Sequence, residues 1–454
     1  MKKVLLLIPS NKKGFIRDVY YGCWHEKKFI DYSWPPIGLY QLYSILEKNF
    51  KTLVVDGSIL NEQQAISKIR KFSPNIIILN IGTFTFKDDL IFLRKIKNNL
   101  KIKVIVCGEF ATTSPKECLN EDCIDYAIKG EPEGAILDLV KNIENSEFLK
   151  KIDGVCFKEH INENSSFVEN LDSIPFPKRS IPEAKNYKNP LAIENPFTTV
   201  LATRGCPYSC TFCTVPILYG KTFRKRNVKN ILDELKILRN DGFKEIFFRD
   251  ENLTLDKEFI KELCNEIIKN KLKFNWICNS RVDTVDEETL KLMKNAGCHL
   301  IKFGVESGNQ EILNKIKKGT TLGKIEEIFF TCKRIGIDTL AHFMLGCPGE
   351  TKETIKKSIE FAKKLNPLYA SFDIVLKYPN TELNCLPKHD LSESELKKWH
   401  DKAFISYYLR PKLVIRHILK VKSPKQFLQK SHETLTLWNS FVKNSFTTHF
   451  KYFY

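Results

Sequence analysis

Apolar and polar positions alternate in two ways over the first 140 residues of the chain. Short β-rich apolar runs occur at Val4–Ile8, Leu53–Val55, Ile76–Leu79, Val104–Cys107 and Tyr126–Ile128. Between them lie stretches with apolar residues at helical spacing, such as Gly38–Lys48 and Asp88–Asn98. Apolar strands that alternate with amphipathic helices are typical of βαβ units around a parallel sheet. We therefore predict an α/β fold that begins with a doubly wound parallel sheet over residues 1–141.

A second alternating array follows further along the chain. Its strand-like runs are Thr198–Ala202, Glu245–Phe248, Phe274–Cys278, Leu300–Gly304, Asp338–Leu345 and Ala370–Leu376. Six βα units are too few for a closed eight-stranded barrel, so we predict a partial (β/α)6 barrel over residues 196–385. Between the two arrays, prolines punctuate a stretch of weak periodicity. This pattern predicts a linker over residues 142–195, laid over the surface.

The remaining residues, 386–454, are predicted to form a helical and basic tail domain. Ser423, Pro424 and Gln426 have the spacing of a helix N-cap, a first-turn proline and a capping-box partner. A mostly apolar stripe then recurs at helical spacing, at Phe427, Ser431, Leu435, Trp438 and Val442. Such a stripe is more often part of a core than a binding surface.

The charge balance is strongly basic. The 72 Lys and Arg residues against 54 Asp and Glu give a formal net charge of +18. This excess favours acidic partners such as phosphates, anionic lipid or an acidic electron carrier. Because lysine is spread along the whole chain, compositional drift on solvated faces is the stronger explanation of the excess.

Membrane-spanning patterns are missing from the sequence. No apolar run approaches the roughly 18 residues needed to cross a bilayer. The start, MKKVLLLIPS, passes directly into a strand-like segment. We therefore expect a cytoplasmic protein without a transmembrane segment.

Three of the 14 cysteines form a group, at Cys206, Cys210 and Cys213. An apolar strand precedes them and breaks at Gly205, so the thiols lie at the carboxyl end of the first barrel strand, where barrels of this kind build active sites. Three thiolates within this short loop can ligate three corners of an iron–sulfur cubane. A structural zinc site is the alternative, but it needs four ligands and would have to recruit a distant one.

The spacing C-x3-C-x2-C, with the aromatic Phe212 before the last cysteine, resembles the signature of the radical S-adenosylmethionine (SAM) superfamily. The resemblance implies that Cys206, Cys210 and Cys213 hold a [4Fe-4S] cluster whose fourth iron binds SAM. It also implies that an electron from a flavodoxin- or ferredoxin-type donor cleaves SAM to a 5′-deoxyadenosyl radical, which abstracts hydrogen from an unactivated carbon.

The resemblance extends to residues at the later strand ends. The contacts with SAM that it implies are Phe212, Asp250, Glu251, Arg281, Glu306, Ser307 and Leu345. The Gly-Gly-Glu form of the family's acidic motif is absent, so either Asp250 or Glu251 is the partner of the SAM ammonium. For Arg281 and Ser307, ordinary loop chemistry is an equally good explanation.

The amino-terminal array lacks a G-x-G-x-x-G after its first strand, which argues against a dinucleotide site. Its short motifs are similar to the cobalamin-binding domain that precedes the barrel in one radical SAM subgroup, which includes anaerobic porphyrin cyclases and cobalamin-dependent methyltransferases. The tail sequence Tyr407–Pro411 is also similar to that subgroup. The cobalamin contacts that the resemblance implies are Thr83, Thr85, Gly108, Gly130 and Glu131. The alternative is that these motifs are ordinary βα turns.

Two features depart from cobalamin domains that ligate cobalt with a histidine. The D-x-H-x-x-G motif is absent, and Cys107-Gly108 stands where Gly-Gly is usual. We therefore expect cobalamin to bind base-off, without a protein histidine on its lower face. His25 is the one histidine among residues 1–141 and is interpreted as structural.

Together these patterns predict a cobalamin-dependent radical SAM enzyme that methylates or remodels an unactivated carbon of a small-molecule or lipid-like substrate. Oxidative ring closure is an alternative reaction. A methylthiotransferase acting on transfer RNA is less consistent, because the first array shows no second cysteine triad and the tail is helical, so we expect no nucleic-acid partner. A non-catalytic iron–sulfur electron-transfer module would leave the pocket residues unexplained. No catalytic residue beyond the cofactor contacts is identified, and the substrate is not readable from the chain.

Overall fold

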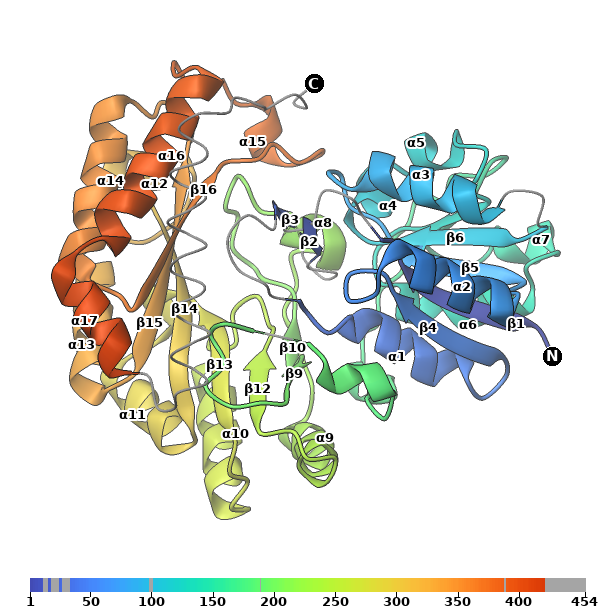
Figure 1. The fold of residues 1–454 in the computed structure, drawn as a ribbon, viewed down its shortest axis with the longest axis horizontal. Helices are drawn as coiled ribbons and strands as arrows, with labels where there is room; N and C mark the ends of the chain where they lie inside the picture. The colour runs from blue at the N-terminus through green and yellow to red at the C-terminus, as the bar shows by residue number, and fades with distance from the viewer. Residues whose placement is uncertain are drawn as a thin grey trace.

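The computed structural model describes residues 1–10, 33–97, 101–187, 189–387 and 389–420, together with the backbone of β2 (Phe15–Arg17) and β3 (Trp24–Glu26). Two α/β units stand side by side (Figure 1). We call the one that contains β1 to β8 the amino-terminal unit and the one that contains β9 to β16 the barrel unit.

The amino-terminal unit is built on a six-stranded sheet. Its strands are β1 (Lys3–Ile8), β4 (Lys51–Asp56), β5 (Ile76–Asn80), β6 (Lys103–Cys107), β7 (Tyr126–Ile128) and β8 (Val155–Phe157). They lie in the order β4-β1-β5-β6-β7-β8, and all neighbours are parallel except β7 and β8. The five parallel strands therefore have the doubly wound order 2-1-3-4-5, in which the winding reverses between β1 and β5.

Helices cover both faces of this sheet. On one face lie α1 (Ile37–Leu46), α6 (Pro132–Lys141) and α7 (Ser146–Leu149). On the other lie α2 (Glu62–Phe72), α3 (Phe86–Lys97), α4 (Glu109–Thr113) and α5 (Pro115–Leu119). The strands between them are buried almost completely, which explains why they are continuous apolar runs in the sequence. The predicted doubly wound sheet is confirmed.

The stretch 142–195, predicted as a surface linker, is only partly irregular. It contains α7 and β8, and β8 adds an antiparallel edge to the first sheet. Its later part includes two short 3-10 helices, at Leu171–Ser173 and Pro182–Lys185. Arg179 and Tyr187 are buried, and the Tyr187 hydroxyl donates to Asp56 at 2.7 Å. A three-residue strand is too short to show a period, which is why the prolines dominated the sequence pattern.

The barrel unit contains six parallel strands in sequential order. They are β9 (Phe197–Val200), β12 (Glu245–Phe248), β13 (Asn275–Ser280), β14 (Cys298–Glu306), β15 (Asp338–Leu345) and β16 (Tyr369–Ile374). The helices between them are α9 (Val228–Asn240), α10 (Lys257–Lys269), α11 (Glu287–Asn295), α12 (Gln310–Lys315), α13 (Leu322–Ile335) and α14 (Lys352–Leu365). Within the described chain β9 and β16 do not pair, so the predicted open (β/α)6 barrel is confirmed.

The two faces of the barrel sheet are packed differently. The outer face and its helices form the largest apolar core of the protein. On the inner face, Phe247, Ile277, Leu300 and Leu340 form a smaller apolar layer, which Trp34 joins from the amino-terminal segment. Consecutive strand residues point to opposite faces, so this layer closes the barrel one to six residues below the strand ends where the site lies.

The tail begins with α15 (Glu382–Cys385), α16 (Glu393–Tyr408) and α17 (Pro411–Leu419). The Tyr408 hydroxyl donates to the Ala370 carbonyl at 2.8 Å, and this bond attaches α16 to the last strand of the barrel. The helix predicted from Ser423 onward lies outside the described residues. Among those that are described, no helix is long and apolar enough to cross a membrane.

Candidate functional site

The three-cysteine loop is closed at its neck by a small antiparallel ladder. The ladder pairs β10 (Thr203–Arg204) with β11 (Arg224–Lys225). Gly205 enters the loop with φ of +87°, and a Cβ at this position would lie 2.2 Å from the Thr222 carbonyl oxygen. Only glycine tolerates both conditions, so the sequence break at Gly205 has a steric cause.

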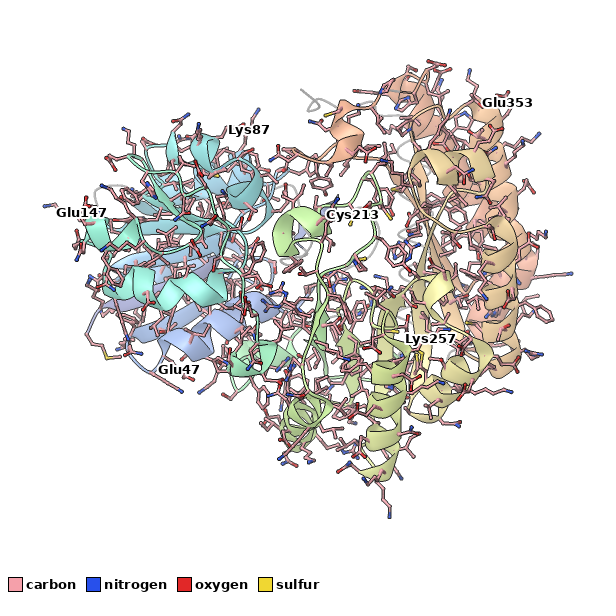
Figure 2. The ribbon with its side chains drawn as sticks, turned by 180° about the vertical axis from the view of Figure 1, so that it is seen from behind. Glu47, Lys87, Glu147, Cys213, Lys257 and Glu353 are labelled. Atoms are coloured by element: carbon pink, nitrogen blue, oxygen red, sulfur yellow. The ribbon has the colours of Figure 1, made fainter. Side chains whose placement is uncertain are left out.

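The cysteine loop lies between the two units, as the position of Cys213 in Figure 2 shows. Cys206, Cys210 and Cys213 are part-exposed, whereas every other described cysteine is buried except the exposed Cys385. Cys206 and Cys213 pack against α8 (Val215–Tyr219). Burial, followed by the neighbouring thiols, raises the pKa of Cys213 to about 12. A bound cation would favour the thiolate form of Cys213.

The geometry of these thiols differs from that of a site for one ion. Among the described residues, no three His, Cys, Asp or Glu side chains converge closely enough to hold a single metal ion. Three thiols on one loop match three corners of a cubane, whereas a structural zinc site takes four ligands.

Two distant segments hold the middle of the loop. The Thr211 amide donates to the Ile316 carbonyl at 3.1 Å, and the Leu383 amide donates to the Thr211 carbonyl at 2.8 Å. Thr211 lies between Cys210 and Phe212 and is 2% exposed. Local sequence contains no signal for these contacts, because both partners are more than 100 residues away.

Asp250 stabilises the turn that leads into the loop. Its Oδ1 accepts hydrogen bonds from the Ala202 amide at 3.0 Å, from the Thr203 hydroxyl at 2.6 Å and from the Thr203 amide. Burial raises the pKa of Asp250 to about 6. One oxygen of the carboxylate therefore has structural partners within the protein, whereas the buried Oδ2 has no hydrogen-bond partner among the described residues.

Glu251 shares this feature with Asp250. Its Oε2 is buried and has no hydrogen-bond partner among the described residues. Burial, followed by the nearby Asp250, raises the pKa of Glu251 to about 8, and Glu251 in turn acts electrostatically on Cys206. A buried carboxylate oxygen without a described partner suits an ammonium group, and Asp250 and Glu251 each have one. The electrostatic link to Cys206 favours Glu251 of the two.

Arg281 lies against the cysteine loop with its donors occupied. The guanidinium carbon is 3.7 Å from the ring centroid of Tyr208, and Nη1 is 3.6 Å from the Cys210 sulfur. The side chain also donates to Asp283 at 2.9 and 2.8 Å and to the Lys318 carbonyl at 2.5 Å. This placement favours a contact with the cluster cysteine over a fork around a carboxylate.

Glu306 is the last residue of β14 and Ser307 follows it, but their side chains have different partners. Glu306 has φ of +68°, and its Oε1 accepts a hydrogen bond from Lys318 at 2.8 Å in a buried ion pair. The Lys318 ammonium lies 5.9 Å from the ring centroid of Phe212. Ser307 is fully buried and lies 3.2 Å from the Ser358 hydroxyl of α14. Sequence analysis did not identify Lys318, which occupies a loop without a recognisable motif.

Leu345 also points away from the site. Its side chain is fully buried in the outer core, and its carbonyl accepts from the Val375 amide at 2.8 Å. Beyond it, Glu350 accepts hydrogen bonds from the amides of Gly346 and Cys347 at 2.5 and 3.1 Å. Burial raises the pKa of Glu350 to about 7. Glu350 therefore shapes the loop that follows β15. Leu345, the predicted contact with SAM, is the last residue of that strand.

A cavity of about 40 Å³ opens at the carboxyl ends of β5, β6 and β7. It is lined by Gly38, Leu39, Leu42, Asn80, Cys107, Gly108, Gly130, Glu131, Pro132, Glu133, Arg204, Leu218 and Tyr219. This is the end of a doubly wound sheet at which ligands bind, next to the reversal of winding. Residues of both units line it, since Arg204, Leu218 and Tyr219 belong to the cysteine loop and its neck.

The predicted cobalamin contacts divide into two groups. Gly108, Gly130 and Glu131 line the cavity, whereas the lining does not include Thr83 or Thr85. The Thr83 hydroxyl donates to Glu109 at 2.8 Å, and the fully buried Thr85 donates to Asp89 at 2.9 Å.

Backbone conformation and close packing within the protein explain why Gly108 and Gly130 are glycines. Gly108 and Gly130 have φ of +100° and +80°, and a Cβ on each would lie 2.4 Å from Asn80 and 2.3 Å from Ser166. The cavity admits only a small part of a large cofactor, such as the end of a tail.

Glu131 joins the two units. Its carboxylate accepts hydrogen bonds from Arg224 at 2.7 and 2.9 Å and from the Val168 amide at 2.6 Å, and it pairs with Arg204 at 3.1 Å. Burial opposes ionisation, but Arg204 and Arg224 outweigh it and lower the pKa of Glu131. Its oxygens are therefore occupied by protein donors, so Glu131 is better described as a clamp on the loop neck.

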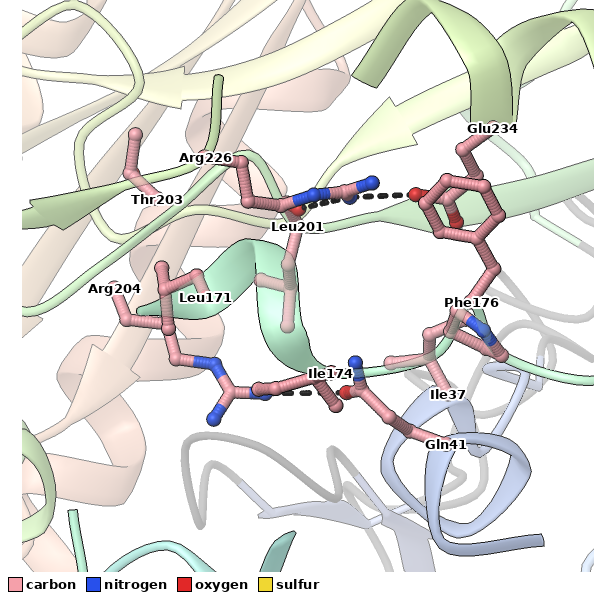
Figure 3. A pocket seen from close by; sticks show the side chains of 11 residues that line it. Ile37, Gln41, Leu171, Ile174, Phe176, Leu201, Thr203, Arg204, Arg226 and Glu234 are labelled. Atoms are coloured by element: carbon pink, nitrogen blue, oxygen red, sulfur yellow. Dashed lines mark hydrogen bonds and ion pairs between the residues drawn. The ribbon is translucent and has the colours of Figure 1, made fainter. Parts of the chain in front are cut away.

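Arg204 extends this clamp. It also pairs with Glu133 at 2.8 Å and donates to Gln41 of α1 at 3.1 Å. Figure 3 shows the bond to Gln41 across a second cavity of about 20 Å³, opposite the ion pair between Arg226 and Glu234. We call Arg204, Arg224, Glu131 and Glu133 the neck clamp.

Comparison with families and curated proteins agrees with this architecture. Residues 200–362 match the Radical SAM superfamily, and residues 30–140 match the B12 binding domain. A Pyrococcus horikoshii protein named as an uncharacterized methyltransferase is 32% identical over 92% of this chain and 95% of its own length. The anaerobic magnesium-protoporphyrin IX monomethyl ester cyclase of Cereibacter sphaeroides is 27% identical over 85% of this chain, which spans 65% of the cyclase.

Two solved structures have the same fold. TsrM from Kitasatospora setae, a radical SAM methyltransferase with cobalamin and a [4Fe-4S] cluster bound, superposes with a TM-score of 0.67 at 19% identity, covering 84% of this chain and 74% of TsrM. OxsB, a cobalamin-dependent radical SAM enzyme with aqua-cobalamin and SAM bound, superposes with a TM-score of 0.70 at 17% identity, covering 96% of this chain and 71% of OxsB.

Proposed function

Because this chain belongs to the radical SAM superfamily and carries an amino-terminal B12-binding domain, we propose that it transfers a methyl group to an unactivated carbon of a small-molecule substrate. Its cofactors are a [4Fe-4S] cluster, SAM and cobalamin. When bound, the cluster and SAM supply a radical that abstracts hydrogen, and cobalamin supplies the methyl group.

The observation that carries this proposal is the neck clamp. Glu131, in a loop of the B12-binding domain, is bonded to both strands of the neck from which the three cysteines project. A cofactor in the cavity of the amino-terminal unit would therefore touch the base of the cysteine loop. The chain thus brings a methyl source and a radical source to one space.

Different residues in and around the loop would bind different cofactors. We assign the cluster to Cys206, Cys210 and Cys213, which are thiols and project from one rigid loop. Arg281, 3.6 Å from the Cys210 sulfur, places a positive charge beside a cluster ligand. Glu251 is assigned to the SAM ammonium, because its buried Oε2 has no partner in the described part of the chain.

Water exclusion is the task of the barrel interior. The apolar layer of Phe247, Ile277, Leu300 and Leu340, completed by Trp34, closes the inner face below the site. A closed floor keeps solvent away from a reactive radical. Lys318, in its buried pair with Glu306, places its ammonium 5.9 Å from the ring centroid of Phe212 of the loop. The electron is proposed to come from a flavodoxin- or ferredoxin-type protein.

Oxidative cyclisation is the second candidate, because the Cereibacter sphaeroides cyclase matches 85% of this chain. A transfer-RNA methylthiotransferase is not proposed. Cys118 and Cys123 pack in the core on one face of the first sheet and Cys107 in the core on the other, so these described cysteines do not form a second triad.

The test measures the two products that SAM can give, 5′-deoxyadenosine and S-adenosylhomocysteine. The reconstituted enzyme is incubated anaerobically with a reductant and extract metabolites, with and without cobalamin. A methyltransferase produces both 5′-deoxyadenosine and S-adenosylhomocysteine, and the second product requires cobalamin, because one SAM is consumed as radical source and another as methyl donor. Formation of 5′-deoxyadenosine with no S-adenosylhomocysteine in the presence of cobalamin would favour the cyclase.

A further inference from the structure

The outer face of α17 is apolar where a surface helix is normally polar. Large aliphatic side chains are exposed there, at Val414 (41%), Ile415 (55%), Ile418 (52%) and Leu419 (79%). With Pro411, the residues Val414, Ile415 and Ile418 follow the i, i+3, i+4, i+7 spacing of a single helix face. The end of α16 adds Ile405 (38%) and Leu409 (52%). We call these side chains the α16–α17 patch.

The opposite side of α17 anchors it to the barrel. Leu413 is 2% exposed, and Arg416 donates to Asp338 at 3.1 Å and to the Asn366 carbonyl at 3.1 Å. Lys420 also pairs with Asp338. The helix is thus fixed with its apolar face outward, on the side of the barrel away from the amino-terminal unit (Figure 1).

The charge of the segment around α17 indicates what kind of surface could cover the patch. The segment 410–420 contains Arg410, Lys412, Arg416 and Lys420 and no Asp or Glu. Arg416 and Lys420 pair with Asp338 on the barrel side, which leaves Lys412 beside the apolar face. An apolar helix face with a basic side chain at its edge is the pattern of a helix that lies in the interface of an anionic membrane. A protein partner would need an acidic rim around an apolar centre, whereas an anionic bilayer has both features everywhere on its surface.

We propose that the α16–α17 patch docks the protein on an anionic lipid surface, with the aliphatic side chains among the acyl chains and Lys412 near the headgroups. Asp338 and Asn366 stand at the amino-terminal ends of β15 and β16, so docking here leaves the opposite, cysteine-loop end of the barrel accessible to SAM and to an electron donor. This inference is independent of the reaction proposed above.

The experiment is vesicle sedimentation of the full-length, cluster-loaded protein under anaerobic conditions. Vesicles of phosphatidylglycerol and phosphatidylcholine are compared with phosphatidylcholine alone at low and high salt. We expect binding to the anionic vesicles only, reduced by salt. The I415S/I418S double variant should bind roughly 10-fold or more weakly, because two buried aliphatic side chains are lost. Lys412→Gln should weaken binding about 5-fold.

The matched control is I91S/I237S, which removes aliphatic side chains of similar exposure (55% and 48%) from α3 and α9. It should bind as the wild type does, and all variants should keep their cluster absorbance and 5′-deoxyadenosine formation. Equal binding to neutral vesicles, or unchanged binding of I415S/I418S, would overturn the proposal. A dimer in sedimentation velocity that I415S/I418S dissociates, without vesicle binding, would overturn it in favour of a second copy of the chain.

Discussion

Arg224 of the loop neck donates two hydrogen bonds to Glu131 of the amino-terminal unit, at 2.7 and 2.9 Å, although 93 residues separate the two in the chain. Glu131 is 1% exposed and is also paired with Arg204. The contact links the unit that carries the B12-binding domain to the base of the three-cysteine loop.

Substitution of Glu131 by Gln should therefore destabilise the protein strongly. It leaves two buried guanidinium groups without their shared carboxylate, and loss of one partner of a buried pair costs about 3–5 kcal/mol. Urea unfolding measures the change. The control is Glu183→Gln, which breaks the more exposed pair with Lys68 and should cost about 0–1 kcal/mol. A similar small loss for both variants would show that the neck clamp contributes little to stability.

Alanine at Cys206, Cys210 or Cys213 should remove the cluster and all formation of 5′-deoxyadenosine. The wild type should bind about four irons per chain after anaerobic reconstitution. Cys385→Ala, at the one exposed described cysteine, is the control and should retain full iron content and activity. Retention of iron and SAM cleavage in the triple alanine variant would refute the assignment of the loop.

Glu251 and Asp250 should respond differently to neutralisation. Glu251→Gln removes a charge-assisted bond to the SAM ammonium worth about 1.5–3 kcal/mol, so SAM should bind roughly 10- to 150-fold more weakly with normal iron content. Asp250→Asn should instead lower the free energy of unfolding by about 1–3 kcal/mol, because Asp250 holds the turn at Ala202 and Thr203. Calorimetric SAM titration and urea unfolding separate the two effects. The reverse pattern would exchange the two roles.

Glu350 should make stability depend on pH. Burial raises its pKa from 4.5 to about 7 in the folded protein, so folding takes up a proton between these values. The stabilisation of the folded state is complete below pH 4.5 and is lost as pH rises to about 7. Between pH 5 and pH 8, wild type should lose on the order of 2–3 kcal/mol more than Glu350→Gln in urea unfolding. Equal losses would mean that the carboxylate is already ionised.

Cobalamin should bind without an axial histidine from the protein. Residues 1–141 lack the D-x-H-x-x-G motif, and the side chain of their one histidine, His25, lies outside the described residues. Electron paramagnetic resonance of the protein loaded with cob(II)alamin should show cobalt lines without nitrogen splitting. Splitting that disappears in His25→Ala would identify His25 as a ligand.

Most helices and strands could be predicted from the sequence because the patterns that indicate them are local. Buried parallel strands such as Ile76–Asn80 need apolar residues on both faces, and this need is visible in any short window of sequence. The spacing of Cys206, Cys210 and Cys213 is local too, since one loop must present three thiols. The cofactors were implied by the resemblance of such local motifs to those of a known family.

Tertiary structure decided which side chains have partners. Asp250 and Glu251 are adjacent and chemically alike, yet only the fold shows that Asp250 holds the turn at Ala202 and Thr203 while Glu251 acts electrostatically on Cys206. Thr85, Ser307 and Leu345 occupy motif positions but are buried in their own unit. β8 was missed because three residues show no period.

The neck clamp and Lys318 were missed for the same reason. The partners of Glu131 and Glu306 come from other parts of the chain, at Arg224 and Lys318. Hydrophobic periodicity reports which face of an element is buried, but it does not report which distant element covers that face. The identity of a charge's partner is set when separate elements pack together, and only the folded chain contains that information.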